Sequence, residues 1–415
     1  MASFDVQLFL GFIQADAYEP LSVEAISYVY SDQATAKTVA SQVCADPKSV
    51  EVLGNVLIGG PFRPGQLFSL CDELDIKFKV SDEVFINTVV AAANETAIAD
   101  YSDGYWADHW DYYLDLINTY LAVYPDGEEA LMYDKELKYF FSPATCVPRS
   151  DKYVLTLTYD GKGHHVQQLD ATRLDPGKEQ QQQNYLNTNT GRIGVDANWQ
   201  VTPEGDHFVS SPIAKLFLLG SIKYATRDAY GMGVEYEGGK PGWNDAMNGL
   251  VGMVGSGMPE TYELQQLLVY VKSVVDKYNR PIVIPEELGD MVDTVNSELD
   301  TLLSSGYTDP EELPFDVPAE LFTYWNNVAT ARETYRLTTK LTFSGKTREI
   351  EAADLSVMLQ KWIDQVELGM ARAMKIGSDG FGNDGHSGVP PCYFSYDVTE
   401  WELNGGHNAV GLVRF

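Results

Sequence analysis

Apolar residues recur at helical spacing over most of this chain, with polar residues between them. A period of about 3.6 residues predicts amphipathic helices. Capping residues support two of the starts, because Ser81 precedes two acidic residues and Pro212 follows Ser211. The pattern predicts helices at 81–100, 111–127, 211–228, 258–278, 287–306, 318–337 and 351–377, and a further helical segment that reaches residue 141.

Extended structure is expected in only a few stretches. Residues 144–173 alternate between apolar and polar positions, and Gly161 and Gly163 indicate a hairpin turn within them. The segment 343–350 is also typical of a strand. Residues 50–60 predict a strand or some other buried apolar segment.

Polar stretches separate some of these elements. Residues 176–209 include a run of glutamines and predict an exposed loop or insertion, and the tail from residue 379 indicates loop and strand. Neither a strand–helix–strand alternation, nor a dinucleotide-binding glycine motif, nor a P-loop occurs in the sequence. Paired helices with loops between them favour a mainly α fold, an α/α toroid with short β-hairpin excursions.

The charge balance limits the classes of partner. The 415 residues include 60 acidic and 29 basic side chains, for a formal net charge of -31. A field of this sign repels nucleic acid and anionic membranes, so an anionic substrate needs a local cluster of cations. The four scattered cysteines form no CxxC pair and indicate free thiols in a reducing compartment. Without a basic leader or an apolar run of ~18–20 residues, we expect a soluble cytoplasmic protein.

The loop GGKPGWNDAMNG, residues 238–249, has the strongest chemical signal. An Asn-Asp pair in a glycine-rich turn is commonly a turn former, and that interpretation stays open here. Trp243 is nevertheless a costly side chain for a loop unless it packs on something, and the glycines permit close approach of a ligand. Apolar surroundings disfavour the ionised form of a carboxyl, which suits a general acid. Asp245 is therefore the candidate acid, with Trp243 and Asn244 beside it.

Carboxylates and rings alternate in YSDGYWADHW, residues 101–110. Carboxylates can accept hydrogen bonds from sugar hydroxyls while rings stack beneath, although an acidic cap before a helix explains the pattern as well. No third ligand lies at a suitable spacing from the Asp-His pair, so we expect no metal. The candidate substrate-binding residues here are Asp103, Trp106, Asp108 and His109.

Three cationic side chains are candidates for binding an anion. Arg149 is isolated in an acidic chain, and His386 and His407 are each flanked by glycine, although each of the histidines can equally be an exposed loop residue. A serine or cysteine nucleophile is not predicted, because the sequence has no G-x-S-x-G elbow and no histidine beside a cysteine.

The segment GKPGWNDAMNGL, followed by GSGMPETYEL, resembles the catalytic segment of inverting glycoside phosphorylases related to cellobiose phosphorylase, in particular the β-1,3-glucan phosphorylases. The segments DGYWADHWDYYLDLI, VPRSDKY and GVPPCYF resemble others of that family, although Cys392 lies where threonine is expected. The resemblance implies an (α/α)6 barrel, with Asp245 as general acid and inorganic phosphate as co-substrate. Arg149, His386 and His407 then become candidate phosphate ligands, and no other cofactor is expected.

The resemblance also implies the domain organisation. We expect residues 1–80 to be an N-terminal segment, as a linker remnant or the first barrel helices. Residues 81–380 would be the catalytic barrel, complete or lacking a hairpin, with an insertion at 150–209. Residues 381–415 would form a C-terminal segment of loop and strand. The large N-terminal β-sandwich domain of the family does not fit in 415 residues, so the match is to the barrel portion.

Three functions follow from these residues. The first is phosphorolysis of β-linked glucose oligosaccharides or glucans to α-glucose 1-phosphate with inversion, for which a single protein carboxyl suffices because phosphate is the nucleophile. The second is an inverting hydrolase, which needs a carboxylate base such as Glu235, Glu237 or Glu260 to activate water. The third is a carbohydrate-binding protein without activity. We expect no nucleic-acid or membrane partner, and homodimerisation is left open.

Overall fold

The computed structural model describes most of the chain, and far more of the described residues lie in helices than in strands. The mainly α class predicted from the hydrophobic pattern is therefore confirmed. The described residues are 2–17, 21–101, 112–149, 153–157, 160–162, 164–168, 172–188, 198–235, 255–309, 317–380, 391, 393–400 and 410–414.

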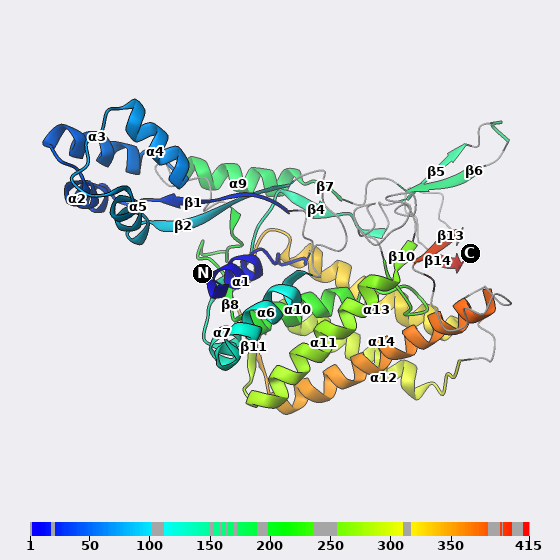
Figure 1. Cartoon of the computed structure of the whole chain (residues 1–415). Helices are drawn as coiled ribbons and strands as arrows, with labels where there is room; N and C mark the ends of the chain where they lie inside the picture. The colour runs from blue at the N-terminus through cyan, green and yellow to red at the C-terminus, as the bar shows by residue number, and fades with distance from the viewer. Residues whose placement is uncertain are drawn as a thin grey trace. The chain divides into compact units, whose positions relative to one another are not determined.

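The chain divides into two compact units (Figure 1). Unit 1 comprises Met1–Pro20, Asp103–Glu179 and Trp199–Phe415, and unit 2 comprises Leu21–Ser102 and Gln180–Asn198. Each unit buries its own clusters of apolar side chains. The division into 1–80, 81–380 and 381–415 stays a prediction.

Unit 2 combines an antiparallel strand pair with short helices. The strands are β1 (Leu21–Val29) and β2 (Asn94–Tyr101), and the helices are α2 (Gln33–Val43), α3 (Pro47–Ile58), α4 (Pro64–Glu73) and α5 (Asp82–Ala91). Leu21 pairs with Tyr101 at one end of the ladder and Val29 with Asn94 at the other. Phe85 is fully buried in the core, with its ring centroid 4.2 Å from that of Phe78.

Two expectations for unit 2 need correction. The strand considered for residues 50–60 is absent, because residues 50–58 belong to helix α3, whose N-terminus is capped by Asp46. The alternative, a buried apolar segment, agrees with the burial of Leu53 and Leu57 on one face of that helix. The helix that begins after Ser81 ends at Ala91 instead of reaching residue 100. The residues that follow pair with β1, a long-range contact that a local pattern does not reveal.

Unit 1 contains the longest helices of the described chain. The helices of unit 1 are α1 (Ala2–Gly11), α6 (Tyr112–Val123), α7 (Glu128–Tyr133), α10 (Pro212–Tyr224), α11 (Met258–Tyr278), α12 (Glu286–Ser304), α13 (Ala319–Thr339) and α14 (Ala352–Gly380), while α9 (Pro176–Thr188) spans the unit boundary. Helix α11 packs against α14, and α12 against α13 (Figure 1). The predicted helices at 258–278, 287–306, 318–337 and 351–377 are thus confirmed.

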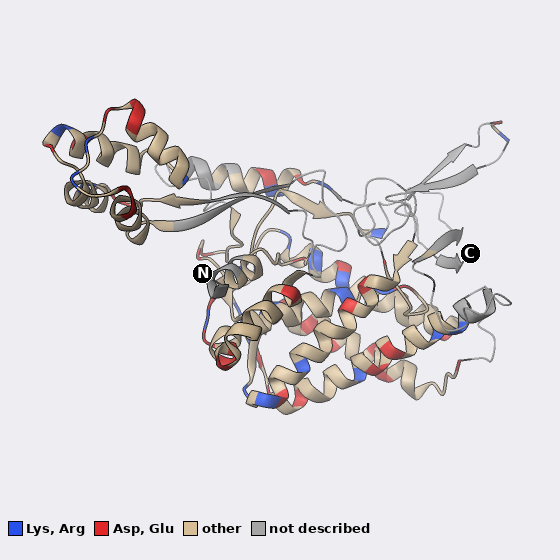
Figure 2. Ribbon diagram, in the orientation of Figure 1, with Lys and Arg blue, Asp and Glu red and all other residues tan. Residues whose placement is uncertain are grey.

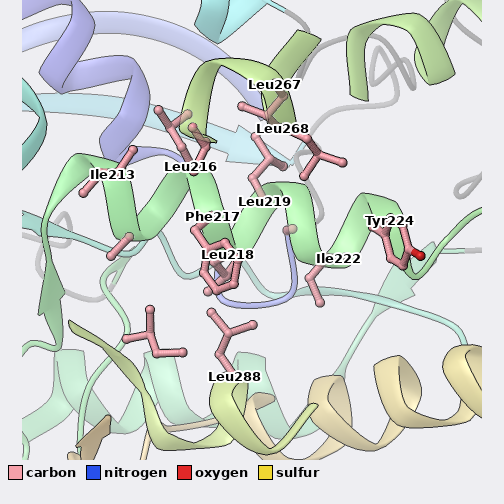
Figure 3. Packing of buried hydrophobic residues seen from close by; sticks show 14 of the residues in the cluster. Ile213, Leu216, Phe217, Leu218, Leu219, Ile222, Tyr224, Leu267, Leu268 and Leu288 are labelled. Atoms are coloured by element: carbon pink, nitrogen blue, oxygen red, sulfur yellow. The ribbon is translucent and has the colours of Figure 1, made fainter. Parts of the chain in front are cut away.

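Helix α10 lies at the centre of the unit 1 core. Each of its residues from Pro212 to Tyr224 is buried, which is expected for a mostly apolar helix, and the buried Lys215 donates to the carbonyl of Gly11. Figure 3 shows Leu267 and Leu268 of α11 on one side of α10 and Leu288 of α12 on the other. Ser211 occupies the N-cap position as predicted, but its side chain makes no capping hydrogen bond.

Short antiparallel ladders complete unit 1. Their strands are β3 (Leu137–Lys138), β4 (Ala144–Cys146), β5 (Tyr153–Leu157), β6 (His164–Gln168), β7 (Thr172–Leu174), β8 (Val209–Ser210), β9 (Val234–Glu235), β10 (Gly255–Gly257), β11 (Ile282–Pro285), β12 (Thr347–Ile350), β13 (Tyr393–Glu400) and β14 (Val410–Arg414). The strands predicted within 144–173 are confirmed, with Gly161 at a φ of 67° in the turn between β5 and β6. Strand β12 confirms the extended segment at 343–350.

Two further expectations for unit 1 need correction. Residues 176–188 form helix α9 rather than a loop. The Asp175 carboxylate accepts hydrogen bonds from the backbone N–H groups of Gly177 and Lys178, and the glutamines that follow are good helix formers. The helical segment expected to reach residue 141 ends at Tyr133, where strand β3 soon takes over.

Charged residues of both signs are interspersed along the long helices of unit 1 (Figure 2). Several form ion pairs that join neighbouring helices or strands, among them Lys361 with Asp300 at 2.7 Å and Arg348 with Asp293 at 2.6 Å. These pairs bring opposite charges together between neighbouring elements but leave the acidic excess of the chain unchanged. Of the helices that the structure describes, none has both the length and the apolar character to cross a membrane.

Candidate functional site

The residues that flank the WND segment form one edge of a four-stranded sheet. Its strand order is β14-β13-β10-β9, and Ser256 of β10 is the antiparallel partner of Glu235 of β9. Residues 236–254, which include Trp243, Asn244 and Asp245, therefore connect two strands that are paired with each other. These residues lie outside the described part of the structure, so the surroundings of Asp245 stay a prediction.

A tight turn around Asp228 stabilises strands β9 and β10, between which the WND segment lies in the sequence. Its Oδ1 accepts hydrogen bonds from the backbone N–H groups of Tyr230 and Met232, both at 3.0 Å. Its Oδ2 accepts from the N–H of Gly233 at 2.8 Å and from Oγ of Ser256 at 2.9 Å. One buried carboxylate thus ties the turn before β9 to strand β10. Charge-assisted hydrogen bonds of this kind make the anchor of the loop rigid.

Glu235, the last described residue before the loop, meets two side chains of α13. Its Oε1 accepts a hydrogen bond from Nε1 of Trp325 at 3.2 Å, and its Oε2 lies 3.9 Å from Nη1 of Arg332. Arg332 is 1% exposed and donates from the same nitrogen to the backbone carbonyl of Ala225 at 2.9 Å. A carboxylate, an indole and a buried guanidinium therefore lie together at the start of the loop.

Arg149 lies against the same indole. Its guanidinium is 5.1 Å from the centroid of the Trp325 ring, within cation–π range. Its Nε donates to Oε1 of Glu333 at 3.0 Å, its Nη1 to Oδ1 of Asn326 at 3.1 Å, and its Nη2 to Oγ1 of Thr330 at 2.9 Å. All three nitrogens of the side chain thus have partners on α13. Binding of phosphate by Arg149 would require it to share or exchange at least one of them.

Glu333 completes this cluster as an anion. Burial acts to raise the pKa of its carboxyl, but the charges of Arg149 and Arg332 and the hydrogen bonds from Arg149 outweigh that effect, so the pKa is lowered from 4.5. Glu333 is therefore ionised at neutral pH and serves as a counterion rather than as a proton donor. Glu235 and Arg149 both contact Trp325, and each is itself paired, Glu235 with Arg332 and Arg149 with Glu333.

The candidate hydrolytic bases differ in their position and in their exposure to solvent. Glu235 is at the edge of the loop, whereas Glu260 is 2% exposed in the first turn of α11. Burial of that degree leaves Glu260 little access to a water at a substrate. Glu237 lies outside the described residues.

A second feature borders this cluster on α13. Most residues that line a groove of ≈ 490 Å³ between α12 and α13 carry a hydroxyl, amide or carboxyl group, among them Glu298, Asn327 and Thr334. Thr330 lines it as well as accepting from Arg149. Tyr335, the only aromatic residue among the described residues that line it, donates its hydroxyl to the carbonyl of Ala15. The groove therefore offers hydrogen bonds but little flat apolar surface for stacking on a sugar.

Of the candidate hydrolytic bases, the structure describes Glu235 and Glu260. Of the residues predicted for phosphorolysis, it describes Arg149. The others lie outside the described residues and stay predictions: Asp103, Trp106, Asp108, His109, Trp243, Asn244, Asp245, His386 and His407. Sequence reasoning missed the roles of Asp228, Trp325 and Glu333. An aspartate just before a Gly-Met-Gly turn was a usable signal for Asp228, whereas nothing local marks Trp325 or Glu333 within a regular helix.

Comparisons with known proteins add no relative. No protein-family model matches the chain, and a search of curated proteins finds no match. Within the described residues, no group of three or more His, Cys, Asp or Glu side chains is arranged to hold a metal ion.

Proposed function

We propose that this chain catalyses phosphorolysis of β-linked glucose oligosaccharides or glucans with inversion, and that Asp245 is the general acid. The observation that carries the proposal is the WND segment, which has a tryptophan and an aspartate in a glycine-rich loop and resembles the catalytic loop of glycoside phosphorylases. The proposed architecture of unit 1 is an (α/α)6 barrel, complete or lacking a hairpin, to which the helix pairs α11–α14 and α12–α13 belong.

The arrangement of the flanking segments supports this proposal. The segment GSGMPETYEL begins with strand β10, whose Gly257 pairs with Tyr393 in the segment GVPPCYF. Arg149 of the segment VPRSDKY lies on Trp325, which donates to Glu235. Three segments that resemble the family, distant in sequence, thus meet around the two ends of the loop. This is where a catalytic loop needs a rigid anchor.

In the proposed reaction Asp245 donates its proton to the glycosidic oxygen as the bond to the anomeric carbon breaks. An oxygen of inorganic phosphate attacks that carbon from the opposite face and forms the new bond, so the product is α-glucose 1-phosphate. Trp243 and the segment 103–109 would hold the donor sugar. Because phosphate brings its own nucleophilic oxygen, no second protein carboxylate has to activate it.

A second candidate is an inverting hydrolase with Glu235 as the base. The observation that favours it is the position of Glu235 at the edge of the loop, with its carboxylate near the Arg332 guanidinium at 3.9 Å. In an inverting hydrolase the two carboxyl groups are ~6.5–9.5 Å apart, which leaves room for a water. Glu235 already accepts a hydrogen bond from Trp325, so this function ranks second.

The deciding experiment measures sugar release from laminari- and cello-oligosaccharides with phosphate present and omitted. Phosphorolysis predicts glucose 1-phosphate only with phosphate, abolition in Asp245→Asn, and substantial activity in Glu235→Gln. A hydrolase predicts equal release without phosphate and loss of activity in both variants. Binding of oligosaccharide in calorimetry without turnover under either condition would refute both functions and favour a carbohydrate-binding protein.

A further inference from the structure

The groove between α12 and α13, called the α12–α13 groove below, is long enough for an extended ligand. At one end Nδ2 of Asn327 donates a hydrogen bond to Oε2 of Glu298 at 2.9 Å. The lining also includes Glu287, about three turns earlier in α12, and Thr338, about three turns later in α13. Three helical turns span ~16 Å, which is the axial separation of the two glutamates. The groove volume of ≈ 490 Å³ is within the range of ~300–1,000 Å³ that is common for small-molecule sites.

The hydroxyl groups along the groove are already used as hydrogen-bond donors. Thr294, Thr330, Thr334 and Thr338 each donate to the carbonyl oxygen four residues earlier in their own helix. Tyr335 donates to the carbonyl of Ala15. A hydroxyl has a single hydrogen, so toward a ligand these groups can only accept. The groove therefore suits a ligand that brings N–H or O–H donors of its own.

Some charges at the groove are balanced by partners within the protein. Asp290, which lines it, forms an ion pair with Arg348. Arg149, which donates to Oγ1 of Thr330, is paired with Glu333 at 3.0 Å. Neither pair leaves a charge for a ligand to neutralise.

The two glutamates are different, because each carries a charge that no cation of the described residues balances. The partner of Glu298 is the neutral amide of Asn327. Oε1 of Glu287 accepts from the backbone N–H of Ser344 at 2.6 Å, while its Oε2 is buried and has no hydrogen-bond partner among the described residues. No lysine or arginine nitrogen of the described part of the chain lies within 4.0 Å of either carboxylate. Cationic donors at the two ends would therefore be stabilised.

The middle of the groove has a narrow apolar strip. Met291, which is 3% exposed, and Ala331 line it between the two glutamates. Charges at the ends with apolar atoms between them match a chain of methylene groups that has an ammonium at each end. A compact divalent metal ion fits less well, since the acidic side chains of the described residues form no group of three that could hold one.

We propose that the α12–α13 groove binds a linear polyamine whose terminal ammonium groups pair with Glu287 and Glu298. The methylene groups lie along Met291 and Ala331, and inner N–H groups donate to threonine oxygens. Spermine in its extended form has about the required length. The net charge of -31 favours the approach of such a cation. This binding does not depend on the proposed function and is measured without any activity.

Equilibrium dialysis of the whole chain against radiolabelled spermine tests the proposal, with other cations added as unlabelled competitors. We expect one tight site per chain. The α,ω-diamine with twelve methylene groups, which is as long as spermine but carries only two charges, should displace spermine at lower concentration than putrescine, a shorter diamine of the same charge. Equal competition by the two diamines and by Mg²⁺ would overturn the proposal, because it would indicate a diffuse counterion effect. Absence of spermine binding would overturn it as well.

Variants locate the site. Glu287→Gln and Glu298→Gln keep the shape of the side chain and an acceptor for the existing hydrogen bond, so each should raise the Kd of spermine about tenfold through loss of charge alone. Asp300→Asn is the control, because Asp300 is an exposed carboxylate of α12 that pairs with Lys361 outside the groove. An equal effect of all three substitutions would refute the location.

A fourth variant blocks the groove without changing a glutamate. Thr334 is exposed in the middle of the lining, and Thr334→Lys places an ammonium group of the protein where the ligand would lie. We expect it to abolish the tight site while the fold is kept. Unaltered binding of spermine by Thr334→Lys would refute the site even if the glutamine variants fail to fold.

Discussion

Replacement of Arg149 by methionine tests the cluster that surrounds Trp325. The side chain is 12% exposed and its partner Glu333 is 22% exposed, so the ion pair is largely withdrawn from water. Methionine keeps much of the stem that lies on the indole but removes every side-chain hydrogen bond to α13, while the backbone N–H of residue 149 still donates to Oε1 of Glu333. Glu333 is then left partly buried without its main counterion.

The size of the effect follows from that burial. Breaking a fully buried pair by removing one partner costs about 3–5 kcal/mol, whereas an exposed pair contributes about 0–1 kcal/mol. For a pair of intermediate exposure we expect a loss of about 2–3 kcal/mol in the free energy of unfolding at neutral pH. The exposed arginine Arg280 is the control, and Arg280→Met should cost about 1 kcal/mol or less.

The pH dependence gives the loss a signature. The folded pKa of Glu333 lies below its ordinary value of 4.5, so its ionised form stabilises the fold above about pH 4.5. This contribution is lost as the pH falls through the folded pKa. In Arg149→Met the guanidinium no longer opposes the effect of burial on the pKa of Glu333. The ionised Glu333 therefore stabilises the fold less, and the variant loses less stability in acid. The difference in stability between the unaltered protein and the variant should therefore shrink in acid.

Urea denaturation followed by circular dichroism, in steps from about pH 7 to about pH 3, measures this difference. A double-mutant cycle with Glu333→Gln isolates the coupling between the two side chains. The reasoning fails if Arg149→Met costs no more than Arg280→Met, or if its cost is the same at both ends of the pH range.

Two further substitutions probe the base of the WND segment. Gly369→Ala places a Cβ 1.7 Å from the carbonyl oxygen of Gly231, so α14 or the Asp228 turn has to move. We expect the free energy of unfolding, measured by urea denaturation, to fall by about 1–3 kcal/mol. An unchanged midpoint would contradict this close approach. Trp325→Phe keeps an aromatic ring but removes the hydrogen bond to Glu235, so stability should fall by about 1 kcal/mol. If the WND segment is catalytic, Trp325→Phe should also lower the activity of the enzyme. Unaltered turnover would show that Trp325 has no role in the reaction.

Most of the long helices were predictable from the sequence. Helices α11 to α14 follow from apolar positions that repeat with the helical period, because each buries one face against its neighbours. The hairpin strands β5 and β6 followed from alternation and from Gly161 in the turn. These signals are local, so a window of the sequence contains them in full.

The errors arose where a second segment of the chain decided the outcome. Residues 94–101 follow a helix and still form strand β2, because β1 offers a partner for pairing more than sixty positions earlier. Residues 176–188 looked like an exposed loop, but the Asp175 carboxylate caps them as a helix and is itself held by Lys340.

The candidate site divides in the same way. The sequence by itself singled out the WND segment and Arg149, because glycine, tryptophan and an isolated cation are unusual in their local surroundings. Only the tertiary structure showed that Arg149 pairs with Glu333, that Trp325 joins Arg149 to Glu235, and that Glu287 and Glu298 line one groove with residues of α13. The residues of these contacts are separated by up to 184 positions. The compensation of buried charge depends on distances in space, which a linear pattern of residue types does not contain.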